Sequence, residues 1–277
     1  MFVGSARAVV AAALAGLALA ITRQRRPSRT QALRLAAVAG GVVLGFPLLT
    51  SLALTTAPAG HGAVVVGLLP VATAAAVVVR TGERPGRAFW VLAGLGALAG
   101  TAFAALQSGG GLHLAPSDLL LLGAVLAGAV GYAEGGLLAR ELGSWQTVSW
   151  ALVLAAPVTI AVASASAVHE APVAGPQAWA AFAYLAAVSM FLGFFAWYRG
   201  LAIGPMAQVS QVQLVQPVLS FAWAGLILHE HIGWPTALGG LVVVVLAGAS
   251  VRTRLRRAER PGRGGASSSR LPGRTGG

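Results

Sequence analysis

The fold of this chain is decided by the stretch QVQLVQPVLSFAWAGLILHEHIGWP, residues 211–235. Two of its landmarks, a proline and a glutamate, recur 147 residues earlier in VVVGLLPVATAAAVVVRTGERPGR, where Pro70 and Glu83 match Pro217 and Glu230. Upstream of both stretches the tripeptide LGF also recurs, at an offset of 148 residues. Similarity at a nearly constant offset is typical of internal duplication, so we interpret the chain as two related units.

The composition predicts an integral membrane protein. Hydrophobic residues make up 57% of the 277 positions and charged residues only 9%, with a mean hydropathy of +0.78, which excludes an ordinary soluble domain. The chain has no cysteine, so it can form neither a disulfide nor a thiolate metal site. We therefore expect an all-α integral membrane protein.

Nine apolar stretches are long enough to cross a bilayer, since a helix that crosses takes roughly 20 apolar residues. Their connections are short and rich in turn residues, so consecutive helices should be antiparallel neighbours with no soluble domain between them. The predicted spans are 3–21, 33–55, 62–80, 88–106, 118–139, 147–167, 178–200, 208–229 and 234–251. We thus expect a bundle of nine transmembrane helices.

Arginine positions predict the orientation of the bundle. All nineteen basic residues are arginines, and eighteen of them fall in alternate connections or in the tail. Because short cytoplasmic loops collect arginine, the C-terminus should be cytoplasmic and the N-terminus outside, with Arg7 snorkelling from a helix end. We expect the tail, residues 252–277, to be disordered and to contact anionic lipids. Nucleic-acid binding would also explain the charge but fits so apolar a chain poorly, so we expect no such partner.

The first span has a second interpretation as a signal peptide. AVVAAALAGLALA has the length of a signal-peptide core, and ALA before Ile21 resembles a cleavage site. However, only Arg7 precedes this run, and the strongest arginine cluster follows it, where a cytoplasmic loop would lie. We therefore favour a membrane-spanning helix.

The two units are predicted to have opposite orientations. Glu83 stands among arginines, whereas Glu230 stands between two histidines with no arginine nearby. Inverted repeats with a site between them are a recurrent plan for secondary transporters. We assign residues 1–107 to a first unit of four helices and residues 117–251 to a second unit of five. The first unit lacks its opening helix, because the repeat offset would place it before Met1.

Two segments resemble the EamA type of the drug/metabolite transporter superfamily. The last three helices of that family are similar to FFAWYRGLAIGPMAQVSQVQLVQPVLSFAWAGLILHEHIGWPTALGGLVVVVLAG, and the start of its second unit is similar to GYAEGGLLARELGSWQTVSWALVL. The resemblance covers nearly the whole chain. It implies two five-helix units in the inner (plasma) membrane and export of small metabolites, amino acids or drugs by alternating access, often coupled to protons.

Compared with the ten-helix architecture of the family, this chain lacks the first helix. A unit of four helices would leave a groove where one helix has no partner. We expect either that the natural product starts upstream of Met1 or that the bundle pairs with a second copy as a homodimer.

A polar stripe in the span 208–229 predicts a substrate site. Its members follow helical spacing, so they face one direction: Gln213, Gln216, Ser220 and Trp223. A glutamine amide facing lipid would leave hydrogen-bonding groups unsatisfied, so the stripe should face a cavity or a neighbouring helix. Both readings stay open for the stripe, while Gln211 points off it and is expected to bond another helix. Pro217, and Pro70 at the equivalent place, should bend their helices.

Further candidate site residues lie near helix ends or inside spans. Glu134 is the carboxylate that lies well inside a span, and intramembrane acids are functional candidates. A carboxylate that couples transport to protons must gain and lose a proton between the two access states. The alternative is that Glu134 pairs with an arginine of another helix. We add Trp197 and Tyr198 as candidate substrate contacts, because a position near a helix end would let them line the cytoplasmic vestibule.

No catalytic residues, cofactor or metal are expected. Nucleophilic and metal chemistry both lack their residue patterns, and the HEH at 229–231 is typical of a solvated turn. A membrane-embedded enzyme is therefore disfavoured. We predict a secondary transporter with a small-molecule substrate. A non-transporting structural or regulatory subunit and a metabolite importer remain as alternatives.

The arginine pattern makes a direct prediction about topology. A reporter that is active only in the cytoplasm should be active when fused after Arg252 and inactive when inserted in TAPAGHG, the connection after the second span. Cytoplasmic activity from that connection would contradict the nine-span topology.

Overall fold

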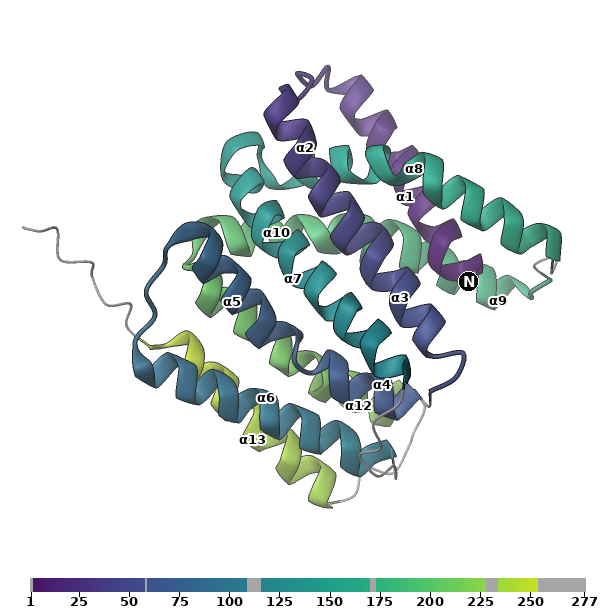
Figure 1. Ribbon diagram of the computed structural model, residues 1–277. Coiled ribbons are helices and arrows are strands. Elements are labelled where there is room, and N and C mark those ends of the chain that lie inside the picture. The colour runs from purple at the N-terminus through teal and green to yellow at the C-terminus, as the bar shows by residue number, and fades with distance from the viewer. Residues whose placement is uncertain (1, 58, 109–115, 170–172, 228–233, 254–277) are drawn as a thin grey trace, which may run out of the picture.

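The computed structural model describes all residues except 1, 58, 109–115, 170–172, 228–233 and 254–277. The described residues form helices joined by short connections, which confirms the all-α membrane class (Figure 1). In chain order the segments are α1 (Phe2–Ile21), α2 (Arg29–Val38), η1 (Ala39–Gly45), α3 (Phe46–Ala53), α4 (Ala59–Val66), α5 (Leu69–Thr81), α6 (Arg87–Ser108), α7 (Pro116–Leu142), α8 (Ser144–His169), α9 (Pro176–Tyr184), η2 (Leu185–Leu192), α10 (Gly193–Ile203), α11 (Met206–Val209), η3 (Ser210–Val215), α12 (Gln216–Ile227) and α13 (Trp234–Val251).

Five continuous helical stretches of the described chain are long and apolar enough to cross a membrane. They are Phe2–Ile21, Arg29–Ala53, Pro116–Leu142, Ser144–Val168 and Pro176–Ile203. Shorter apolar helices cover Leu69–Thr81, Arg87–Phe103 and Ala237–Val251. This arrangement is compatible with nine spans, and the number nine stays a prediction.

Two predicted spans are interrupted directly before a proline. Two residues separate the end of α4 from the start of α5, and Pro70 lies in the first turn of α5. In the second half, the 3-10 segment η3 gives way to α12 one residue before Pro217. Proline has no N–H and fits the first turn of a helix, where that group would have no partner. Each proline thus lies at an interruption within a predicted span, where the sequence predicts a bend of a continuous helix. The side chain of Pro217 lies outside the described residues.

Corresponding segments support the internal repeat. The two π-helical segments η1 and η2 begin 146 and end 147 residues apart, and π segments are rare enough for this match to carry weight. Helices α6 and α13 begin 147 residues apart, and the same offset carries α1 onto α8. In both pairs the two counterparts pack against each other (Figure 1). We therefore propose the division into units at 1–107 and 117–251.

Helix α7 lies at the centre of the bundle. It contacts α3, α5, η1 and α2 from the first half, and α8 and α10 from the second. Figure 1 shows α7 running between α3 and α5. Small residues permit this approach: a Cβ atom at Gly41 would lie 2.3 Å from the Ala127 carbonyl oxygen and 3.1 Å from the Gly131 Cα. Close backbone contact through small residues is how helices pack in lipid, where no hydrophobic force drives them together.

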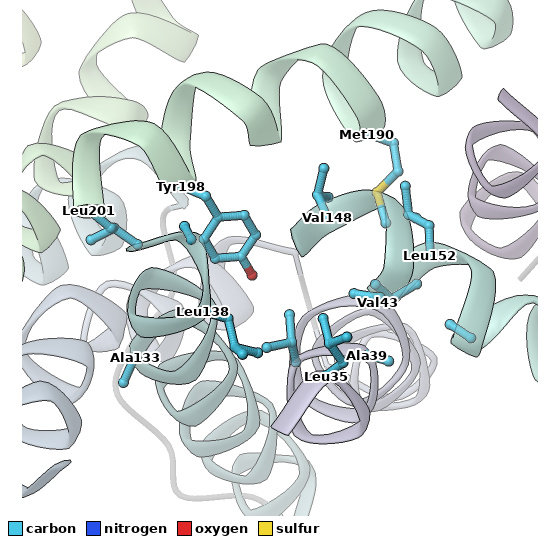
Figure 2. Packing of buried hydrophobic residues seen from close by; sticks show 14 of the residues in the cluster. Leu35, Ala39, Val43, Ala133, Leu138, Val148, Leu152, Met190, Tyr198 and Leu201 are labelled. Atoms are coloured by element: carbon cyan, nitrogen blue, oxygen red, sulfur yellow. The ribbon is translucent and has the colours of Figure 1, made fainter. Parts of the chain in front are cut away.

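The largest core lies where α2, η1, α7, α8, η2 and α10 meet. Figure 2 shows Leu35 and Val43 from the first half facing Leu138, Val148 and Met190 from the second, and all five are buried. The two halves thus share one core, which keeps their helices together on this side of the bundle.

The close contact at Gly41 leads to a stability prediction. Gly41→Ala should destabilise the fold by about 1 to 3 kcal/mol, because the new methyl meets backbone atoms that cannot rotate away. The neighbouring Gly40 has nothing within 4 Å of an added Cβ, so Gly40→Ala is the matched control and should be neutral. Thermal unfolding in detergent measures both variants. Equal melting temperatures would contradict this packing of η1 on α7.

Candidate functional site

A cavity of about 540 Å³ lies between η2–α10 and η3–α12, with α7 contributing one residue to its wall. This volume falls within the range of small-molecule sites. The lining is mainly apolar and aromatic, with a few amide and hydroxyl groups. It consists of Tyr132, Ser189, Gly193, Phe194, Trp197, Val212, Gln213, Val215, Gln216, Leu219 and Trp223.

The structure brings together four of the six predicted substrate residues around this cavity. Gln213 and Gln216 lie on one wall with Trp223, and Trp197 lies on the opposite wall. Ser220 lies in α12 with Gln216 and Trp223, but its side chain is outside the described residues. The described part of the stripe lines this cavity, and Gln213 also bonds Tyr132 of α7, so the substrate role and the interhelical role of the stripe both stay predictions.

Tyr198 does not line the cavity. Its ring is fully buried in the shared core, and a Cβ atom at Gly135 would lie only 2.2 Å from the Tyr198 Cε1. Figure 2 shows the ring extending from α10 into this core. The side chain fits a space that only glycine on α7 leaves open. The geometry supports a packing role for Tyr198 in place of the predicted substrate contact.

Tyr132 lines the cavity and is not among the site residues predicted from the sequence. Its ring packs edge-on against Trp197, with centroids 5.6 Å apart and planes at 68°. Its side chain also forms a hydrogen bond with Gln213. Its place well inside the span 118–139 was the available signal, since belt residues lie at span ends. Tyr132 thus links α7 to both walls of the cavity.

Two hydrogen-bonding atoms of the cavity residues have no partner among the described residues. They are the side-chain oxygen Oε1 of Gln213 and the indole Nε1 of Trp197, and both atoms are buried. An unpaired buried polar atom costs roughly 1 to 3 kcal/mol, so such atoms call for an explanation. One is an acceptor and the other a donor. A ligand that offers both groups would satisfy them after a small movement of the side chains.

Glu134 lies in an ion pair that joins three helices. Its Oε2 accepts a hydrogen bond from the Arg34 Nε at 2.8 Å, and its Oε1 accepts one from the Arg80 Nε. Arg34 also reaches Glu141 Oε1, at 2.5 Å from its Nη1. The carboxylate of Glu134 is thus held between α2 and α5. This is the alternative that the sequence offered for Glu134, and the proton-coupling role stays a prediction.

Other polar contacts lie at the same arginine-rich end of the bundle, and those of Glu83 join the two halves. Glu83 accepts hydrogen bonds at 3.3 Å from the backbone amides of Met206 and Ala207, which begin α11. A carboxylate at a helix N-terminus is favourable because the amides there lack partners within the helix. From α7, Arg140 donates to backbone carbonyls at the end of α10, those of Leu201, Ala202 and Gly204.

Deeper in the bundle, the interhelical contact predicted for Gln211 is confirmed. Its Nε2 donates to the Pro70 carbonyl at 3.0 Å, and the Ser210 hydroxyl lies 3.3 Å from the same oxygen. The broken helices of the two halves therefore meet at Pro70. The landmark Glu230 and the HEH at 229–231 lie outside the described residues.

The cavity lies against helices of the second half in the same way that α7 lies against the equivalent helices of the first half. Helix α7 packs on η1, α3 and α5, whose counterparts by the repeat offset, η2, α10 and α12, line the cavity. The predicted helix upstream of Met1 and the predicted second copy of the chain both stay predictions.

These features define a polytopic helical membrane protein with a cavity of small-molecule size beside its interrupted helix η3–α12. Residues 115–251 match the EamA-like transporter family. The "Uncharacterized transporter YdeK" of Bacillus subtilis (strain 168) is 41% identical over 252 residues, which cover 91% of this chain and 87% of that protein. The chain belongs to the EamA-like transporter family and is a membrane transporter, which confirms the resemblance inferred from the sequence.

The same fold is found in a solved crystal structure. The two chains are 20% identical and superpose with a TM-score of 0.71, covering 90% of this chain and 86% of that one. At this level of identity the likeness concerns the fold, and it extends over both halves of the chain.

Proposed function

We propose that this protein is a secondary transporter of the inner (plasma) membrane that exports small molecules by alternating access through the cavity between α10 and α12. The observation that carries this proposal is the convergence of Gln213, Gln216, Trp197 and Trp223 on one cavity from separate helices. Helices broken near the middle of a span, as at Pro70 and Pro217, are where transporters of this general kind build their sites.

The cavity wall indicates the chemistry of the substrate. None of its lining residues carries a charge, so an ionic group on the substrate would lose its hydration without gaining a counter-ion. Aromatic rings line both walls, and the unpaired atoms of Gln213 and Trp197 offer one acceptor and one donor. We infer an uncharged or weakly polar substrate with a flat apolar part and hydrogen-bonding groups, which favours drugs and neutral metabolites over amino acids.

Contacts at the arginine-rich end of the bundle support a state in which the cytoplasmic side is closed. Contacts of Glu134 and Glu83 tie the two halves together at this end, which the arginine pattern assigns to the cytoplasm. In the alternating-access scheme they close the inner side of the bundle, and their release opens it. The C-terminus is then cytoplasmic.

The substrate site can be tested by flux. A thermal-shift screen of uncharged aromatic compounds would select a ligand, and its transport would be measured with purified protein in liposomes. Gln213→Leu should lower transport about tenfold, since it removes hydrogen bonds worth about 1 to 1.5 kcal/mol. The matched control is Gln177→Leu, an exposed amide in α9, which should keep wild-type flux. Equal flux in the two variants would place the site elsewhere, and absence of flux in any gradient would contradict transport.

The proton-coupling role of Glu134 has its own test. Glu134→Gln keeps the shape of the side chain but never ionises, so the variant should stay folded and lose the pH dependence of transport. Glu141→Gln is the control, since this carboxylate lies on the same helix, pairs with Arg34 and is more exposed. If Glu134→Gln keeps the wild-type pH profile, Glu134 serves only to hold Arg34 and Arg80.

A further inference from the structure

A second cavity, of about 520 Å³, shares no lining residue with the proposed substrate site and lies where the connection between α1 and α2 meets the connection between α7 and α8. Unlike the first cavity, it is lined by charged groups and amides. The lining consists of Gln24, Arg25, Arg26, Ser28, Gln31, Glu141, Leu142, Gln146 and Trp150.

The available charge of this cavity is positive. Arg25 and Arg26 are exposed, and within the described part of the chain neither forms an ion pair. The single acidic group, Glu141, is already engaged, because its Oε1 lies 2.5 Å from Arg34 Nη1 and its Oε2 accepts from Gln31 Nε2 at 3.4 Å. Two guanidinium groups therefore remain to bind an anion.

The backbone holds these two arginines beside the cavity. Helix α1 ends at a turn in which Arg23 adopts a left-handed conformation with φ 50°, which is uncommon for any residue except glycine. Helix α2 then starts with a closed capping box, in which Ser28 and Gln31 bond to each other's backbone amides. The segment that carries Arg25 and Arg26 is thus short and fixed at both ends.

The closed capping box also shows which groups are left to bind a ligand. Because Ser28 and Gln31 satisfy each other, this helix start offers few free donors. The guanidinium groups are the donors that remain, and each can contact a phosphate through two parallel N–H groups. The binding chemistry is therefore that of arginine side chains.

The lining also has an apolar part. Trp150, in the second turn of α8, and Leu142, the last residue of α7, line the cavity together with Glu141 and Gln146. Tryptophan prefers the level of the lipid headgroups, and the arginine pattern assigns this end of the bundle to the cytoplasmic face. The cavity thus combines two cations with an aromatic ring. Basic pockets between transmembrane helices bind anionic headgroups.

We propose that this cavity is a binding site for a phosphate-bearing anion, held by Arg25 and Arg26 in a lining that includes Trp150. A phospholipid headgroup of the cytoplasmic leaflet and free phosphate share this chemistry. The site is separate from the proposed substrate cavity, and its existence does not depend on what the protein transports.

Native mass spectrometry of purified protein tests the proposal. The protein would be exposed to equal amounts of phosphatidylglycerol and phosphatidylcholine, and the retained lipid would be counted. Wild type should retain phosphatidylglycerol in preference. The double variant Arg25→Gln/Arg26→Gln should bind it about 30-fold more weakly, given about 1 kcal/mol for each arginine near the membrane surface.

The control is the double variant Arg84→Gln/Arg87→Gln, which removes two exposed arginines outside the cavity from the same predicted face. It should keep the wild-type preference. Equal losses in the two double variants would overturn the proposal, because net charge alone would then explain binding. Equal retention of the two lipids by wild type would also overturn it, because the protein would then show no preference for the anionic headgroup. Adding inorganic phosphate separates the two sources: displacement of the lipid at millimolar phosphate identifies free phosphate as a ligand, and its persistence identifies the headgroup.

Discussion

A carboxylate inside an apolar bundle must be held next to positive charge, and Glu134 is held by Arg34 and Arg80 from two other helices. This requirement fixes the rotation of α7 and draws α2 and α5 against it at the arginine-rich end of the molecule. Glycines then let the backbone of α7 approach η1 and the ring of Tyr198. Much of the bundle is arranged around this one helix.

The proposed site depends on the same helix. Tyr132 lies two residues before Glu134, so the ion pairs that hold α7 also hold the tyrosine against Trp197 and Gln213. Movement of α7 relative to α2 and α5 would therefore change the cavity wall. This provides a physical link between the proposed closure of the arginine-rich end and the shape of the proposed substrate site, within a protein whose family is one of transporters.

Arginine carries out three different tasks in this chain. Arg34 and Arg80 neutralise a carboxylate, Arg140 donates to the carbonyl end of α10, and Arg25 and Arg26 face a cavity without a partner among the described residues. The guanidinium group suits all three, because it stays charged and presents several donors in a fixed plane. The arginine pattern of the sequence predicts only that these five residues lie on the cytoplasmic side, and it does not separate their three roles.

The sequence by itself determined the membrane class and predicted bends at Pro70 and Pro217, because apolar runs and proline act through local chemistry. It indicated the family through the resemblance of two segments. It also indicated the stripe of Gln213, Gln216 and Trp223. Only the tertiary structure decided that Tyr132 joins this cavity and that Tyr198 is buried, since both depend on which face of α7 meets α10. The partners of Glu134 were likewise undetermined, because Arg34 and Arg80 are brought to it by folding over 100 and 54 residues of sequence.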